Sequence, residues 1–188
     1  MTHIALFLMV TTLQLQNGMV AAGADHLLSV EKLGKVVEAC WEASVEDADC
    51  DREDVTLKLL AAYYGESGFD PKKRRVNTNH SVDVGIAQVN SVHLVRRRGK
   101  PSTFEVWCGL RGYKYRPGLI WDMKVNARFG AYVNVLCRRP AGPGGIPGWQ
   151  YVYRNGGRKD QDVVYRYLAR VRSFTRALEG AHTEEGSR

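Results

Sequence analysis

The stretch YGESGFDPKKRRVNTNHSVDVGIAQVN, residues 64–90, decides how the rest of the chain is interpreted. Near its start it holds the carboxylate of Glu66, and a polar turn punctuated by glycines follows. Upstream of Glu66, apolar residues recur at helical spacing: Val55, Leu59, Ala62 and Tyr63. This pattern predicts an amphipathic helix that carries Glu66 on its buried stripe. Burial favours the neutral acid, so we predict a raised pKa for Glu66, as a general acid near neutral pH requires.

The opposite interpretation is structural. Glu66 would then be the last polar residue of a helix that ends at Ser67 and Gly68. Perturbed carboxylates are uncommon, and many of them serve the fold rather than a reaction. The sequence around Glu66 has to decide between the two readings.

The remaining pattern predicts a mainly α, single-domain protein. Helices are expected over residues 27–41, 54–64, 121–136 and about 160–178, and strands only as short pieces near residues 82–89. Residues 42–54 hold seven carboxylates and predict a solvated loop that ends in a helix N-cap at Asp51 or Asp54. Residues 104–118 show no clear period and predict a disulfide-stapled loop. Residues 138–148 have the composition of a linker.

The composition fits one globular domain with an excess of positive charge. Of the 188 residues, 44% are apolar, and 27 Lys plus Arg against 20 Asp plus Glu give a net charge of +7. Such a balance favours an anionic partner, and nucleic acid, a membrane surface and bacterial cell wall all qualify. No recognition motif accompanies the basic runs at residues 72–75 and 96–98, so nucleic acid is not expected as a partner.

The N-terminal region has the composition of an export signal. The first 24 residues contain no Lys, Arg, Asp or Glu and lead from an apolar run into Ala22-Gly23-Ala24. This predicts a signal peptide over residues 1–24, with an uncleaved N-terminal anchor as the alternative. Residues 25–178 would form the domain and residues 179–188 a disordered tail. The mature protein is expected in the periplasm or at the cell wall, with no stable membrane span.

The cysteines agree with export. The chain has 4 of them, all beyond residue 24: Cys40, Cys50, Cys108 and Cys137. An even number in an exported chain predicts two disulfides, and the sequence leaves all three pairings open. No CxxC pair occurs and the histidines are scattered, so no metal site and no cofactor are expected.

Two linked motifs carry a family resemblance. They are Glu66-Ser67-Gly68-Phe69-Asp70-Pro71 and Ser81-Val82-Asp83-Val84-Gly85-Ile86-Ala87-Gln88-Val89-Asn90-Ser91. Together they resemble the lysozyme-like lytic transglycosylases, above all the small members associated with bacterial type III and type IV secretion systems. The resemblance implies a lysozyme-like fold with very short strands, peptidoglycan glycan strands as substrate, and a secretion or injection apparatus as a further partner.

The resemblance also implies roles for individual residues. Glu66 matches the family's catalytic glutamate, which protonates the glycosidic oxygen and then deprotonates the muramic acid C6 hydroxyl. That hydroxyl closes onto C1, and because it is tethered to the substrate, a single carboxylate suffices. Substrate contacts are implied for four residues of the two motifs: Ser67, Gly85, Ile86 and Gln88.

The chain departs from the family pattern at two positions. Ala87 stands where the family usually has Met. In the third motif, a Tyr-Asn-Ala/Gly-Gly turn, Arg154 takes the tyrosine position, so that Tyr153 is a displaced candidate beside Asn155. We count Tyr153 and Asn155 among the predicted substrate contacts.

Two other functions stay open. Asp83, 17 residues after Glu66, matches the second carboxylate of animal-type lysozymes, so a hydrolase that uses Glu66 and Asp83 is the first alternative. Asp83 would otherwise brace its loop through backbone N–H groups. The second alternative is an inactive wall-binding module, against which the presence of Glu66 argues.

Overall fold

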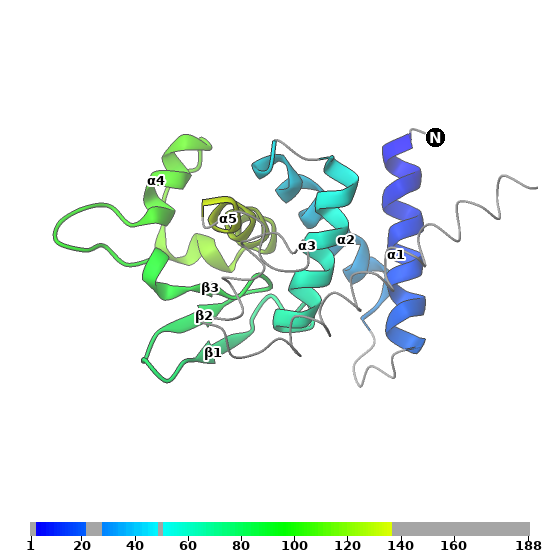
Figure 1. Ribbon diagram of the computed structural model, residues 1–188, viewed down its shortest axis with the longest axis horizontal. Coiled ribbons are helices and arrows are strands. Elements are labelled where there is room, and N and C mark those ends of the chain that lie inside the picture. Colours follow the sequence, from blue (N-terminus) through cyan, green and yellow to red (C-terminus); the bar gives the residue numbers. More distant parts are fainter. Residues whose placement is uncertain (1–2, 22–27, 49–50, 137–188) are drawn as a thin grey trace, which may run out of the picture.

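The computed structural model describes residues 3–21, 28–48 and 51–136 (Figure 1). Within these ranges the protein is mainly helical with one small sheet. The helices are α1 (His3–Ala21), α2 (Val30–Ala43), α3 (Arg52–Ser67), α4 (Thr103–Leu110) and α5 (Met123–Leu136). The strands are β1 (Arg74–Val76), β2 (Val82–Val84) and β3 (Val89–Asn90), and short 3₁₀ segments cover Ser44–Glu46, Ser91–His93 and Pro117–Trp121.

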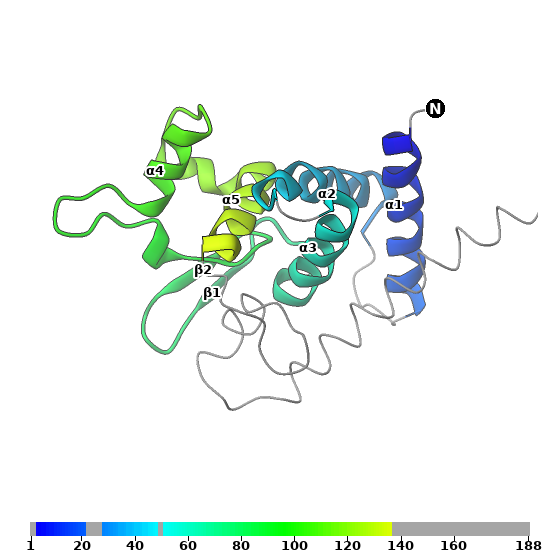
Figure 2. The same cartoon turned by 45° about the horizontal axis from the view of Figure 1, so that its top comes forward.

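Helix α2 lies at the centre of the helical part and contacts α1, α3 and α5 (Figures 1 and 2). It begins after Ser29, whose hydroxyl accepts the Lys32 N–H at 3.4 Å. Its buried residues recur at helical spacing: Leu33, Val36, Val37 and Cys40. Helices α3 and α5 therefore pack against one apolar stripe of α2.

Helix α1 covers another side of α2. The Phe7 ring lies 5.5 Å from the Trp41 ring, and Phe7, Thr11 and Leu15 are buried. In the described residues no helix is both long and apolar enough to cross a membrane. Cleavage of the predicted signal peptide stays a prediction.

The sheet is antiparallel in the order β1-β2-β3. Arg75 pairs with Asp83, and Asp83 pairs with Asn90 in the next strand. β1 is exposed along its whole length, whereas Val84 and Val89 face the core. The prediction of a mainly α protein with short strands is confirmed, but β1 lies before residues 82–89, the region to which strands were predicted to be confined.

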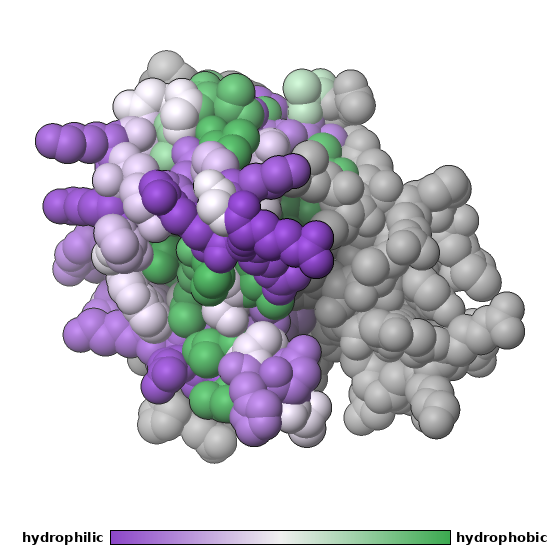
Figure 3. Space-filling view, turned by 90° about the vertical axis from the view of Figure 1, so that its left-hand side faces the viewer, coloured by the Kyte–Doolittle hydropathy of each residue, from purple (hydrophilic) through white to green (hydrophobic). Residues whose placement is uncertain are grey.

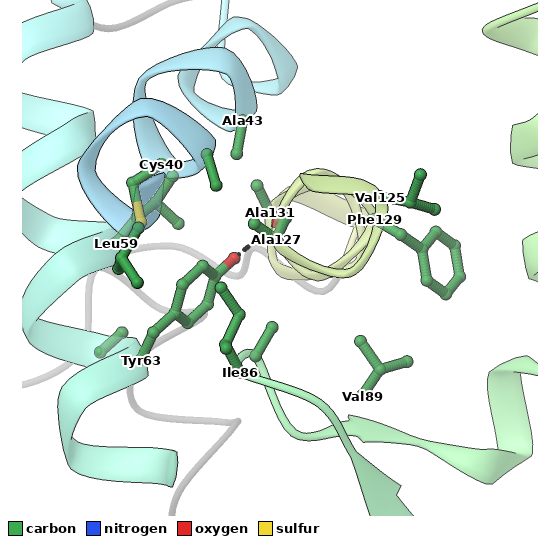
Figure 4. Packing of buried hydrophobic residues seen from close by; sticks show 14 of the residues in the cluster. Cys40, Ala43, Leu59, Tyr63, Ile86, Val89, Val125, Ala127, Phe129 and Ala131 are labelled. Carbon is green, nitrogen blue, oxygen red and sulfur yellow. Dashed lines mark hydrogen bonds between the residues drawn. The ribbon is translucent and has the colours of Figure 1, made fainter. Parts of the chain in front are cut away.

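The core joins α2, α3, α5 and the residues after β2. Figure 4 shows Tyr63 of α3 pointing toward α5, and Ile86 and Val89 lie below α5 in this view. On α5, Val125, Phe129 and Val133 are buried as the periodicity predicts, but Trp121 precedes the helix and is exposed. Helix α5 therefore closes the core over α3 and the loop that follows β2.

Two predictions about loops are wrong. Residues 104–118 contain helix α4, which opens with a capping box between Ser102 and Glu105. The acidic segment is not simply solvated, because the fully buried Glu46 side chain binds Arg111 and Arg128. α3 begins at Arg52, directly after the candidate cap Asp51.

Candidate active site

Glu66 lies in the last turn of α3 and is half-buried. The apolar stripe that precedes it is buried as predicted. The Tyr63 hydroxyl donates to the carbonyl oxygen of Ala127 on α5 at 2.7 Å, so that the end of α3 is tied to a helix 64 residues away (Figure 4). The core thus fixes the backbone that carries Glu66.

Ser67 links this helix end to the second motif. Its Oγ lies 2.9 Å from the carbonyl oxygens of both Tyr63 and Ile86, and it accepts the Phe69 N–H at 3.1 Å. A hydroxyl has a single proton, so it donates to one of these carbonyls at a time. The side chain is buried. This geometry makes Ser67 a bridge between the two motifs, and its predicted contact with substrate stays a prediction.

Both motifs contain residues in the left-handed region of backbone conformation. Gly68 and Phe69 have φ of 64°, Gly85 has 75° and Gln88 has 47°. Residues other than glycine adopt this backbone conformation at a cost of about 1–2 kcal/mol. Phe69 and Gln88 are nevertheless buried there. Such strained residues persist only where the surrounding structure holds them, and they are common at functional sites.

The second motif is directed inward. The Ile86 side chain is buried, and Gln88 Nε2 donates to the carbonyl oxygen of Gly85 at 2.8 Å. A Cβ atom built on Gly85 would lie 2.2 Å from Nδ2 of Asn126 on α5. The missing side chain of Gly85 therefore makes room for α5, and its predicted contact with substrate stays a prediction.

Ala87 packs tightly on α5. Its Cβ lies 2.4 Å from the position that a Cβ on Gly130 would occupy, so the two small residues allow the loop to approach the helix. The usual methionine of the family would meet the α5 backbone here. Alanine in place of the family's methionine at position 87 therefore fits the close packing against α5.

Asp83 is braced within the sheet. Its Oδ2 accepts from Asn77 Nδ2 at 2.9 Å and its Oδ1 accepts from Asn90 Nδ2 at 2.7 Å. The donors are side-chain amides, whereas we expected backbone N–H groups. Each carboxylate oxygen thus has a partner on a neighbouring segment of the hairpin.

The two basic runs, residues 72–75 and 96–98, are exposed. Exposed valines accompany them, among them Val76 and Val95. Figure 3 views the end of the molecule that carries α4, where hydrophilic side chains project around a strip of hydrophobic ones. Basic and apolar side chains are therefore both exposed in and next to these runs.

The cysteines that lie in the described ranges are unpaired. Cys40 and Cys108 are buried free thiols, and burial raises the pKa of both. The described residues therefore show no disulfide where two were expected, and Cys50 and Cys137 lie outside these residues. Tyr153 and Asn155 also lie outside them, as do the predicted helix at about 160–178 and the tail. The described ranges contain no cluster of His, Cys, Asp or Glu that could hold a metal ion.

The structure thus brings four predicted residues of the two motifs together: Ser67, Gly85, Ile86 and Gln88. It adds one that sequence analysis missed, the buried Asn126. The only sequence signal for it is an amide at helical spacing from Phe129 and Val133, on a face that also carries Asn134. Comparison of the chain with protein-family models, curated proteins and solved structures found no match.

Proposed function

We propose that this protein is a peptidoglycan lytic transglycosylase in which Glu66 is the catalytic acid and base. The observation that carries the proposal is the 2.9 Å contact between Ser67 Oγ and the Ile86 carbonyl oxygen. It joins the Glu66-Ser67-Gly68-Phe69 motif to the Gly85-Ile86-Ala87-Gln88 motif, 19 residues further along the chain. In the family that both motifs resemble, these two segments form one active site.

In the proposed reaction Glu66 moves a proton twice. It first protonates the oxygen that links N-acetylmuramic acid to N-acetylglucosamine, and the bond between C1 and that oxygen breaks. The Glu66 carboxylate then takes the proton of the muramic C6 hydroxyl as its oxygen bonds to C1. The product is a 1,6-anhydro sugar, and no water is consumed. The half-buried position of Glu66 suits a group that must hold a proton and then accept one.

The same proposal extends to the fold. The resemblance implies a mainly helical lysozyme-like fold with very short strands. Here α3 ends at Ser67, and β1-β2-β3 follow directly in the chain. We therefore propose the lysozyme-like fold for this chain.

The geometry of Asp83 bears on the hydrolase alternative. Its two oxygens accept hydrogen bonds from Asn77 and Asn90, which brace the strand. Each carboxylate oxygen has a second acceptor site, so these bonds are compatible with either role. The fragments released from sacculi therefore decide between the two reactions.

The exposed basic runs supply the contact with the wall. Lys72–Arg75 and Arg96–Arg98 would attract the anionic polymers of the sacculus, in a protein exported to the periplasm or cell wall. A secretion or injection apparatus would be the further partner.

Mass spectrometry of digested sacculi tests the proposal. Release of anhydromuropeptides is the expected result, and Glu66→Gln serves as the inactive control. Muropeptides with reducing ends would identify a hydrolase. If sacculi bind the protein but no fragment is released, the wall-binding module is the correct alternative.

A further inference from the structure

Asn126 on α5 makes three hydrogen bonds inside the core. Its Nδ2 donates to the carbonyl oxygens of Val84 and Ile120, each at 3.1 Å, and its Oδ1 accepts the Ala87 N–H at 2.9 Å. The residue is only 1% exposed. An amide side chain offers two donor hydrogens and one acceptor oxygen, so each of its polar atoms is used. Asn126 therefore binds the backbone on both sides of Gly85.

The Ala87 N–H belongs to the same peptide group as the Ile86 carbonyl. Asn126 holds the nitrogen end of this group, and Ser67 Oγ lies 2.9 Å from its oxygen end. A peptide group is planar and rigid, so fixing one end fixes the direction of the other. The orientation set by Asn126 thus reaches Ser67, the neighbour of Glu66 in the last turn of α3.

The backbone of Gly85 is adapted to this contact. A Cβ at residue 85 would lie 2.2 Å from Asn126 Nδ2, and φ of Gly85 is 75°. Only glycine combines that conformation with so close an approach. The glycine of the second motif and the asparagine of α5 therefore form a matched pair.

We propose that Asn126 is a positioning residue for Glu66, acting through the Ile86–Ala87 peptide group and Ser67. This inference rests on the proposed function. It assigns to α5 a part in the active site that neither motif contains. Without Asn126, the Ile86 carbonyl can turn, and the Ser67 hydroxyl loses a fixed partner.

Asn134 supplies a matched control. It lies on the same helix, is 5% exposed, and its Oδ1 has no hydrogen-bond partner among the described residues. Both Asn126→Ala and Asn134→Ala therefore remove a buried amide from α5. Turnover per folded molecule on soluble glycan strands should fall about 10²-fold in Asn126→Ala, with KM little changed, because a small misplacement of reacting groups can cost that much. Asn134→Ala should retain wild-type turnover.

Asn126→Asp adds a pH signature. The ionised carboxylate still accepts the Ala87 N–H, but it faces the Val84 and Ile120 carbonyls without a proton to donate. Burial favours the neutral acid, which recovers one of these donations. The ratio of variant to wild-type turnover should therefore rise as pH falls. A flat ratio would overturn the proposal.

Amide hydrogen exchange at Ala87, followed by NMR, separates this proposal from the proposed function. Exchange should accelerate in Asn126→Ala and stay slow in Asn134→Ala. If the wild type releases no anhydromuropeptides, the proposed function fails while the exchange data still decide whether Asn126 holds the peptide group. Unchanged exchange, or unfolding of both Asn126 variants where Asn134→Ala folds, would reduce Asn126 to a residue of the core and overturn the proposal.

Discussion

The end of α3 and the hairpin of β1 and β2 each carry one carboxylate of the motif stretch, and they hold it in different ways. The helix end is tied to residues distant in the chain, through Ser67 to Ile86 and through Tyr63 to Ala127, 19 and 64 residues away. Asp83 is held by Asn77 and Asn90, only 6 and 7 residues away. The position of Glu66 is thus a product of the whole fold, whereas that of Asp83 is largely local.

The largest effect is expected at Glu66, and Asp83 serves as its comparison. Glu66→Gln keeps the size of the side chain but cannot exchange the proton, so general acid–base catalysis worth about 10²–10⁴-fold should be lost. Asp83→Asn should lose far less. The new side-chain NH₂ group of residue 83 would face the NH₂ group of either Asn77 or Asn90, so one hydrogen bond is lost. This loss should lower the stability by about 1 kcal/mol. Release of anhydromuropeptides and circular dichroism of both variants check these outcomes.

Two results would reverse this comparison. Comparable losses at Glu66 and Asp83 would identify a hydrolase that uses both carboxylates. Unfolding of Glu66→Gln, or its full activity on sacculi, would make Glu66 a structural residue of the helix end.

The next largest effect concerns the ion pairs of Glu46, which also join residues distant in the chain. Glu46 is buried and binds Nε and Nη2 of Arg111 and Nε of Arg128, which lie 65 and 82 residues further along the chain. Removing one partner of a fully buried ion pair costs roughly 3–5 kcal/mol. The Arg111 and Arg128 side chains are 36% and 26% exposed and stay partly hydrated, so we expect the lower end, about 3 kcal/mol. Glu46→Gln should lower the free energy of unfolding by that amount in urea denaturation.

Glu38 is the control for this loss. It binds Lys124 at 3.0 Å at the surface, where both side chains are exposed. Such pairs contribute about 0–1 kcal/mol, so Glu38→Gln should change little. Equal losses of unfolding free energy at Glu46 and Glu38 would mean that the buried ion pairs of Glu46 stabilise the fold no more than the surface pair of Glu38 does.

A smaller loss of stability separates two glycines of the motif stretch. Gly68 and Gly85 both have positive φ, but no atom lies within 4 Å of a Cβ on Gly68, whereas Asn126 blocks one on Gly85. Gly68→Ala should therefore cost only backbone strain, about 1 kcal/mol. Gly85→Ala should add overpacking and cost about 3 kcal/mol in all.

A double variant sharpens this test. In the double variant Gly85→Ala/Asn126→Ala the steric conflict is absent. Its loss of unfolding free energy should therefore be smaller than the sum of the losses in the two single variants. Additive losses in urea denaturation would show that Asn126 does not restrict residue 85.

The contrast between local and distant ties also explains what the sequence could predict. The buried stripe of α3 and the short strands depend on periodicity, which is visible in the sequence. The burial of Glu46 and the role of Asn126 depend on partners far along the chain, which no local pattern reveals. α4 is a different case, since Ser102 and Glu105 have the spacing of a capping box and could have identified its start.

The smallest expected effect concerns the capping box of α4 and its pH dependence. Glu105 accepts from Arg96 and from the Ser102 N–H, and these bonds, with Arg96 contributing most, lower its pKa to about 2. A carboxylate whose pKa is lowered by folding stabilises the folded state above its unfolded pKa near 4.5, and this contribution is lost as pH falls toward 2. The stability difference between the wild type and Glu105→Gln should therefore shrink over that range in urea denaturation. Ser102→Ala removes a hydroxyl that does not titrate, so its loss of about 1 kcal/mol should persist at low pH. A Glu105 difference that stays constant from pH 7 to pH 2 would show that the Arg96 and Ser102 bonds do not stabilise the start of α4.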